Sequence, residues 1–237
     1  MPSMFQNIKN FIRIARSVSK RYHTLDTPEI YHERVAPAKE LMTCLDIPIS
    51  GPSAEDLKAK GKCIYVANHA SALDAVLICA FFDIDVRILA KSSLFRVPTI
   101  GTVLSAEHHI KVYRGKNAHE RNQNIRDAIK SALNDGACIF MFPEGTRTRN
   151  GELGKFKLGA FYNAVQNHVP IVPVVIRGTF EAMPRGKFNV KSVPCSMKLL
   201  DAIDPPDEAT GNEQERAQKM ANDAHRAIEQ DLQTFGR

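Results

Sequence analysis

Short apolar runs alternate with helical patterns along most of this chain, and this alternation is the feature that most limits its fold. The runs that read as buried strands are 63–67, 86–90, 137–142 and 171–176. Helical patterns lie at 72–82, at 117–134 (which ends before Gly136) and at 217–232. Strands that alternate with helices indicate an α/β fold, so we predict a single mixed, largely parallel sheet flanked by helices.

The amino-terminal end is basic and amphipathic. Residues 1–25 contain five basic residues and no acidic one, in a chain with a formal net charge of +6. Apolar residues recur at helical spacing over 4–18, and the basic residues lie largely outside that stripe. This pattern predicts an N-terminal amphipathic helix that lies in the interface of an anionic membrane, with its cations against lipid phosphates. The alternative is that the apolar stripe packs against the protein's own core.

A change of pattern near residue 50 separates the N-terminal part from the predicted sheet. A second helical pattern over 31–45 contains Pro37, so we expect it to be kinked or split. The Pro-Ile-Ser-Gly-Pro-Ser run at 48–53 is typical of a linker. We therefore predict a membrane-docking segment, 1–50, followed by an α/β domain, 51–237.

The composition argues against disulfides, a metal site and a membrane-spanning segment. Five cysteines are scattered without C-x-x-C pairing, which indicates small buried side chains in a reducing compartment rather than disulfides. Histidines and cysteines do not cluster at ligand spacing, so we expect no metal site. The longest apolar stretch, 75–82, is far below the ~20 residues that span a bilayer, and we expect neither a transmembrane helix nor a signal peptide.

Two polar motifs follow predicted strands directly. His69 lies just after the first strand with Asp74 five positions later, and Phe-Pro-Glu-Gly-Thr-Arg at 142–147 follows the third. Ligands of such sheets bind beyond the carboxyl ends of the strands, so His69 and Glu144 should both reach that edge. A histidine whose other ring N–H is held by a carboxylate can take a proton from a hydroxyl. The alternative for His69 is a structural histidine near a helix start.

Cationic side chains accompany these motifs. Arg147 can bind a phosphate bidentately, and Lys91 and Arg114 are further candidates. Otherwise Lys91 would be a solvated surface residue and Arg114 an ion-pair partner. Glu144 would bind an acceptor hydroxyl, pair with Arg147 or stabilise a turn. Gly145 would supply a backbone conformation that other residues resist.

The order of the sequence blocks resembles a known family. The blocks are 66–74, 91–95, 109–114, 142–147 and 169–174. They resemble the glycerolipid acyltransferases, the family of 1-acylglycerol-3-phosphate (lysophosphatidate) acyltransferases and glycerol-3-phosphate acyltransferases. The resemblance covers about residues 60–200. This chain departs from the family's pattern in the block at 109–114. That block often ends Ile-Asp-Arg in the family, whereas Tyr113 precedes Arg114 here.

The resemblance implies transfer of a fatty acyl group from an acyl thioester to the free hydroxyl of 1-acylglycerol-3-phosphate, which gives phosphatidate. The thioester, acyl-CoA or acyl carrier protein, would be a co-substrate, and no other cofactor is implied. His69 and Asp74 would be catalytic. The implied substrate-binding residues are Lys91, Arg114, Glu144, Gly145, Thr146 and Arg147. We expect a peripheral protein on the cytoplasmic face of an anionic membrane.

The sequence also allows other acceptors of the acyl group and other functions. Glycerol-3-phosphate, another lysophospholipid or a lyso-amino-lipid would be alternative acceptors, and in a thioesterase water would replace the alcohol. A different class is a basic module that binds membranes or nucleic acid. The chain has no nucleic-acid-binding motif and no Trp, so we expect no nucleic-acid partner.

Overall fold

The computed structural model describes residues 28–113, 118–187 and 189–234, together with seven separate residues of the N-terminal segment. These seven are Lys9, Arg13, Ile14, Arg16, Ser17, Lys20 and Tyr22, and all are helical. Most of the amphipathic helix predicted over 4–18 therefore lies outside the described residues, and its docking on a membrane stays a prediction.

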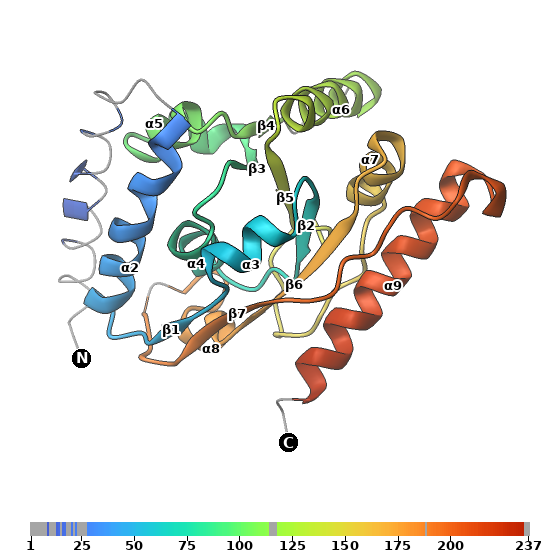
Figure 1. The fold of residues 1–237 in the computed structure, drawn as a ribbon. Helices are drawn as coiled ribbons and strands as arrows, with labels where there is room; N and C mark the ends of the chain where they lie inside the picture. Colours follow the sequence, from blue (N-terminus) through green and yellow to red (C-terminus); the bar gives the residue numbers. More distant parts are fainter. Residues whose placement is uncertain are drawn as a thin grey trace.

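The described chain folds into one sheet with helices between its strands (Figure 1). The strands are β1 (Ile49–Ser50), β2 (Ile64–Ala67), β3 (Val86–Lys91), β4 (Ile110–Val112), β5 (Cys138–Met141), β6 (Ile171–Arg177) and β7 (Cys195–Leu199). The α-helices are α2 (Val35–Cys44), α3 (Ala54–Ala59), α4 (Leu73–Phe81), α5 (Ile100–Ala106), α6 (Ala118–Asn134), α7 (Gly159–Asn167), α8 (Thr179–Ala182) and α9 (Glu213–Thr234). The 3-10 helices are η1 (Pro28–Arg34), η2 (Ser92–Arg96) and η3 (Glu208–Thr210). None of these helices combines the length and apolar character needed to cross a membrane.

The strand order β1-β7-β6-β2-β5-β3-β4 makes a mixed, largely parallel sheet, as predicted. The β6–β7 pair is antiparallel, and the other strand pairs are parallel. The four predicted strands and the predicted helices at 72–82, 117–134 and 217–232 are confirmed. The carboxyl ends of β2, β5, β3, β4 and β6 consequently share one edge of the sheet.

Helices cover both faces of the sheet, which makes three layers (Figure 1). Successive side chains of β2 enter opposite cores: Tyr65 packs with α2 and α4, whereas Ile64 and Val66 pack with α6, α7 and α9. This alternation follows from the two-residue repeat of a strand. Because both faces are covered, the central strands are apolar throughout, which is why continuous apolar runs identified them in the sequence.

The linker predicted at 48–53 is wrong for its second and third residues. Ile49 and Ser50 form β1 and pair in parallel with Cys195 and Ser196 of β7. A two-residue edge strand has too little periodicity to be found in the sequence. The pattern over 31–45 is split rather than kinked, because η1 ends at Arg34 and α2 begins at Val35, which places Pro37 in its first turn.

The N-terminal residues share the core of the sheet through a buried polar cluster. Glu107, fully buried after α5, accepts hydrogen bonds from Tyr22 and Arg34, and His109 Nε2 lies 3.2 Å from its carboxylate. Arg34 also donates to the carbonyls of Phe82 and of Ile84, at 2.6 and 2.9 Å. Burial alone raises the pKa of Glu107. The His109 hydrogen bond and the Arg34 charge outweigh that effect and hold the pKa below its ordinary value.

Removing Arg34 should destabilise the protein strongly. In Arg34→Ala the Glu107 carboxylate stays buried without its main counter-charge, which typically costs about 3–5 kcal/mol. Urea unfolding monitored by circular dichroism would measure the loss in free energy of unfolding. Arg226→Ala, which breaks an exposed pair with Asp223, is the matched control and should have little effect.

Urea unfolding of wild type and Arg34→Ala at low pH tests whether the negative charge of Glu107 causes the difference. A carboxyl with a lowered pKa in the folded state stabilises the protein above its unfolded pKa of about 4.3, and this contribution disappears as the pH falls through the folded value. The difference between wild type and Arg34→Ala should therefore narrow in acid. An Arg34→Ala variant as stable as wild type at neutral pH would contradict this account of the cluster.

Candidate active site

The first predicted motif places His69 and Asp74 in contact. His69 follows β2, and Asp74 lies in the first turn of α4, where a negative charge is favourable. The distance from His69 Nδ1 to Asp74 Oδ2 is 2.7 Å, and the same oxygen accepts the backbone N–H of Ala70 (2.8 Å) and of Ser71 (3.0 Å). Asp74 is completely buried, whereas the His69 side chain is 22% exposed. The carboxylate thus holds Nδ1–H, which leaves Nε2 as the nitrogen that can act as a base.

Two further contacts hold His69 in place. The ring of Phe142, at the end of β5, stacks on the imidazole with centroids 3.9 Å apart and planes 20° apart. The His69 carbonyl accepts the Thr148 N–H at 2.8 Å, which ties the histidine to the loop after β5. Asn68 continues the β2–β6 pairing, because its side-chain amide exchanges two 2.8 Å hydrogen bonds with the backbone of Ile176. These contacts fix both the backbone and the ring of the histidine.

The Glu144 carboxylate accepts hydrogen bonds from two backbone N–H groups. Its Oε1 accepts the His69 N–H at 2.7 Å, and its Oε2 accepts the Gly154 N–H at 3.0 Å. A Cβ at Gly154 would lie 2.6 Å from Oε2, so a larger residue there would have to displace the Glu144 carboxylate. Burial raises the pKa of Glu144, although the two N–H donors oppose the change. Of the three possibilities weighed from the sequence, this geometry is closest to the turn stabiliser: it joins the segments that follow β2 and β5.

The predicted anion-binding residues lie at the end of a tight turn over 142–145, in which the Gly145 N–H donates to the Phe142 carbonyl at 2.9 Å. Gly145 has φ of +71°, a conformation that favours glycine, as predicted. Thr146 is exposed and Arg147 half-buried. Arg185, in the loop after α8, donates to Thr146 Oγ1 (3.2 Å) and to the Arg147 carbonyl (3.3 Å). Arg185 therefore bonds to the segment that carries Arg147, and the sequence motifs reveal only Arg147.

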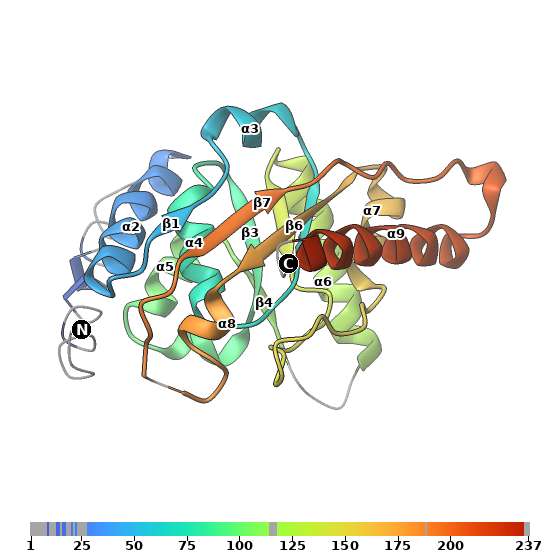
Figure 2. The ribbon, with the colours of Figure 1, turned by 90° about the horizontal axis from the view of Figure 1, so that it is seen from below.

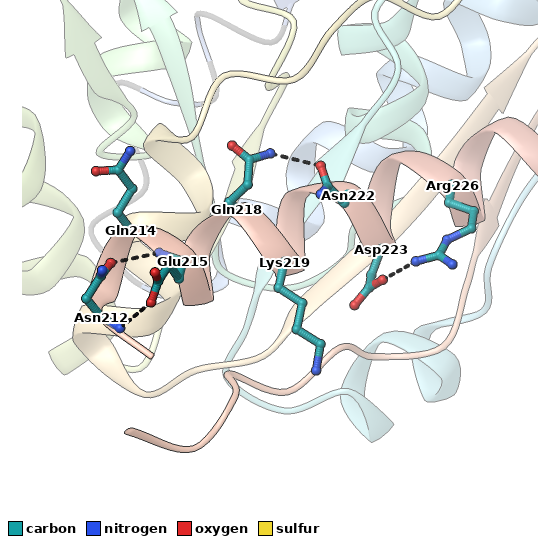
Figure 3. A pocket seen from close by; sticks show the side chains of 8 residues that line it. All are labelled: Asn212, Gln214, Glu215, Gln218, Lys219, Asn222, Asp223 and Arg226. Atoms are coloured by element: carbon teal, nitrogen blue, oxygen red, sulfur yellow. Dashed lines mark hydrogen bonds and ion pairs between the residues drawn. The ribbon is translucent and has the colours of Figure 1, made fainter. Parts of the chain in front are cut away.

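A cavity of about 260 Å³ adjoins His69. Its polar wall includes His69, Glu144 and Thr148, and apolar side chains such as Phe180 and Leu232 line it from α8 and from the end of α9. A larger hollow, about 740 Å³, runs along α9 (Figure 3). It contains none of the predicted site residues, and the polar side chains that line it largely pair with one another, as Gln218 does with Asn222. We therefore assign the site to the smaller cavity.

The remaining predicted residues lie farther along the same edge. Lys91 is the exposed last residue of β3, two strands from β2 in the sheet. Arg114 lies outside the described residues. Within the part of the chain that the structure describes, no three His, Cys, Asp or Glu side chains are arranged to hold a metal ion.

The residues that sequence reasoning missed have weak or no sequence signals. Asn68 and Phe142 lie inside the sequence blocks 66–74 and 142–147, so their position was a usable signal. Arg185 belongs to no motif, and only the return of the chain after α8 brings it to Thr146.

A family model described as Acyltransferase matches residues 51–177, more than half of the chain. The chain belongs to the acyltransferase family. The family prediction is thereby confirmed, and both motifs lie inside the matched region.

Similar proteins support the same assignment. The chain is 35% identical over 161 residues to the 1-acyl-sn-glycerol-3-phosphate acyltransferase of Limnanthes douglasii, which covers 68% of this chain and 56% of that protein. It is 31% identical over 150 residues to the enzyme of the same name from Haemophilus influenzae, covering 63% and 61%. The chain thus spans less than two thirds of the length of either relative.

A solved structure shares the fold. The crystal structure of the 1-acyl-sn-glycerophosphate (LPA) acyltransferase PlsC from Thermotoga maritima superposes with a TM-score of 0.72 at 24% identity, over 90% of this chain and 86% of that one. This similarity supports the mixed sheet with its flanking helices.

Replacing Glu144 should loosen the segments around His69. Glu144→Ala removes the acceptors of the His69 and Gly154 N–H groups, and each buried donor left without a partner costs about 1–3 kcal/mol. Hydrogen exchange at these two amides, together with urea unfolding, would measure the effect. Glu152→Ala, an exposed carboxylate in the same loop, is the control. Unchanged amide protection in Glu144→Ala would contradict the assignment.

Proposed function

We propose that this protein transfers a fatty acyl group from an acyl thioester, acyl-CoA or acyl-ACP, to the free hydroxyl of 1-acylglycerol-3-phosphate and so forms phosphatidate. The observation that carries the proposal is the 2.7 Å contact between His69 Nδ1 and buried Asp74, near the Thr146–Arg147 segment to which Arg185 bonds. The names of the two relatives support this acceptor.

In the proposed reaction His69 is a general base. Nε2 takes the proton of the acceptor hydroxyl as its oxygen attacks the thioester carbonyl carbon, and Asp74 stabilises the imidazolium that forms. When the tetrahedral intermediate collapses, the C–S bond breaks and the thiolate takes the proton from the imidazolium. The products are the ester and the free thiol, and His69 returns to its neutral form.

Ser71 supports direct transfer rather than an acyl-enzyme. Its hydroxyl donates to the Met183 carbonyl at 2.6 Å and accepts the Leu73 N–H at 3.2 Å, and the residue is fully buried. A nucleophilic serine needs its hydroxyl bonded to the base. The contacts of Ser71 instead fix the start of α4 against the segment after α8.

Arg147 and Arg185 are the proposed phosphate ligands, with Lys91 and Arg114 as further candidates. A phosphate can accept paired hydrogen bonds from each guanidinium, and such charge-assisted bonds are stronger than neutral ones. The Arg185 side chain donates to the Arg147 carbonyl, so Arg185 lies against the segment that carries Arg147.

The alternative acceptors are glycerol-3-phosphate, another lysophospholipid and a lyso-amino-lipid. We propose a peripheral location on the cytoplasmic face of the membrane, where a lysophospholipid would be reached from its surface. The alternative of a basic binding module has no use for a buried carboxylate that holds a half-exposed histidine.

Thiol release from an acyl thioester, with and without 1-acylglycerol-3-phosphate, tests the proposal. Release that needs the acceptor, together with phosphatidate as product, is the expected result. Release without acceptor would indicate a thioesterase. Release that responds to glycerol-3-phosphate or to another lysolipid alone would reassign the acceptor.

Removing the dyad should abolish turnover while substrate binding survives. His69→Ala should lower kcat by about 10²- to 10⁴-fold, the usual contribution of a positioned base. Asp74→Asn should lower kcat by a similar order, because the amide no longer holds the His69 ring in the tautomer that has its proton on Nδ1. The exposed pair of His32 and Asp83 offers a matched control, and His32→Ala should retain activity. Wild-type turnover by His69→Ala would overturn the mechanism.

Loss of either arginine should weaken acceptor binding more than turnover. We expect Arg147→Ala and Arg185→Ala each to raise the acceptor KM about tenfold, the size of one charge-assisted hydrogen bond. Steady-state kinetics at varied acceptor and saturating thioester would measure this. Lys187→Ala, an exposed cation in the same loop as Arg185, should leave KM near the wild-type value. An unchanged KM in Arg185→Ala would remove Arg185 from the site.

A further inference from the structure

Three large apolar side chains stand exposed in the part of the chain that the structure describes, and they gather at the ends of two adjacent strands. Leu94 and Val97, 41% and 40% exposed, follow β3, and Tyr113, 59% exposed, follows β4. The register pairs Lys91 with Val112, so the segments that leave β3 and β4 begin side by side. Soluble proteins rarely expose large apolar side chains together without a use for them.

Cations accompany these side chains, and exposed acids do not. Arg96 and Lys111 are exposed, and Lys111 Nζ lies 4.9 Å from the centre of the Phe95 ring. Between Lys91 and Tyr113 the sequence has one acid, Glu107, which is buried against Arg34. We call Leu94, Val97 and Tyr113, together with Arg96 and Lys111, the β3–β4 tip.

The β3–β4 tip shares an edge of the sheet with His69. β2, β5, β3 and β4 are parallel neighbours about 4.8 Å apart, so their carboxyl ends align. Figure 2 shows α5, the loop after β5 (yellow) and α8 along the same side of the molecule. Exposed cations continue along the segments that follow β5 and β6: Arg149, Lys155, Lys157, Arg185, Lys187 and Lys191. The exposed acids of those two segments are Glu152 and Glu181.

We infer that the β3–β4 tip is a membrane-contact surface, which inserts Leu94, Val97 and Tyr113 between the headgroups of an anionic bilayer. Apolar side chains ringed by cations match the acyl boundary and the lipid phosphates, whereas a soluble anion would need no exposed leucine. The inference rests on the proposed function, because a lysophospholipid acceptor lies in the bilayer and must reach His69 across this edge. This surface is formed by residues that come after the N-terminal segment, 1–50, in the sequence, and it places the site against the membrane.

The absence of Trp from the sequence permits a direct test. Leu94→Trp places a single fluorophore on the tip, and Gln218→Trp places one on the exposed face of α9 as the matched control. With phosphatidylcholine vesicles that contain phosphatidylglycerol, emission from Leu94→Trp should shift to shorter wavelength and be quenched by lipids with brominated acyl chains. Emission from Gln218→Trp should do neither.

Three results would contradict the inference that the β3–β4 tip contacts the membrane. If Leu94→Trp floats with the vesicles but is not quenched, another surface docks and the inference fails. It also fails if the protein does not bind the vesicles at all, or if both tryptophans are quenched alike. Quenching does not depend on turnover, so a quenched Leu94→Trp in a protein that transfers no acyl group would overturn the proposed function and leave this surface standing.

Substitution on the tip should weaken partition without harming the site. Leu94→Ser with Val97→Ser should lower vesicle partition by about tenfold or more, since each buried apolar side chain contributes on that scale. Arg96→Gln should lower it about fivefold, and only when the vesicles are anionic, whereas Arg226→Gln should not. With short-chain substrates that stay monomeric in water, all these variants should turn over like wild type. Equal partition of the double variant and wild type would refute the inference.

Discussion

The site depends on one buried carboxylate, Glu144, whose two oxygens accept backbone N–H groups from different segments. One donor is His69 itself and the other is Gly154, so a single side chain joins the segments that follow β2 and β5. Burial makes the charge costly, as the raised pKa of Glu144 reflects, and the two donors offset part of that cost. Thr146 and Arg147 come directly after the turn over 142–145 that contains Glu144.

Asp74 fixes the imidazole of His69, whereas Glu144 fixes the backbone at His69. One of its oxygens receives His69 Nδ1 and two backbone N–H groups, so the carboxylate and the ring are held in a single arrangement. Phe142 closes one face of the ring. A base positioned in this way needs little reorganisation when it receives a proton, which is the physical advantage of a fixed dyad.

The N-terminal part belongs to the body of the molecule where the structure describes it. Ile14 and Tyr22 are buried in the same core as Tyr65 and Phe82, and Tyr22 bonds to Glu107 after α5. The buried cluster around Glu107 therefore joins the N-terminal segment to the helix beside the β3–β4 tip.

The sequence by itself determined the central strands, the helices between them and the two motifs, because continuous apolar runs and fixed local spacings carry that information. His69 and Asp74 are five residues apart on one strand-to-helix turn, so their contact is local. Only the tertiary structure decided the rest. β1 has only two residues, too few to show a period. Glu144 accepts backbone N–H groups from two segments, and Arg185 reaches the Arg147 carbonyl from a loop far along the chain. These features depend on pairings between distant segments, and such pairings leave no periodic trace in the residues that make them.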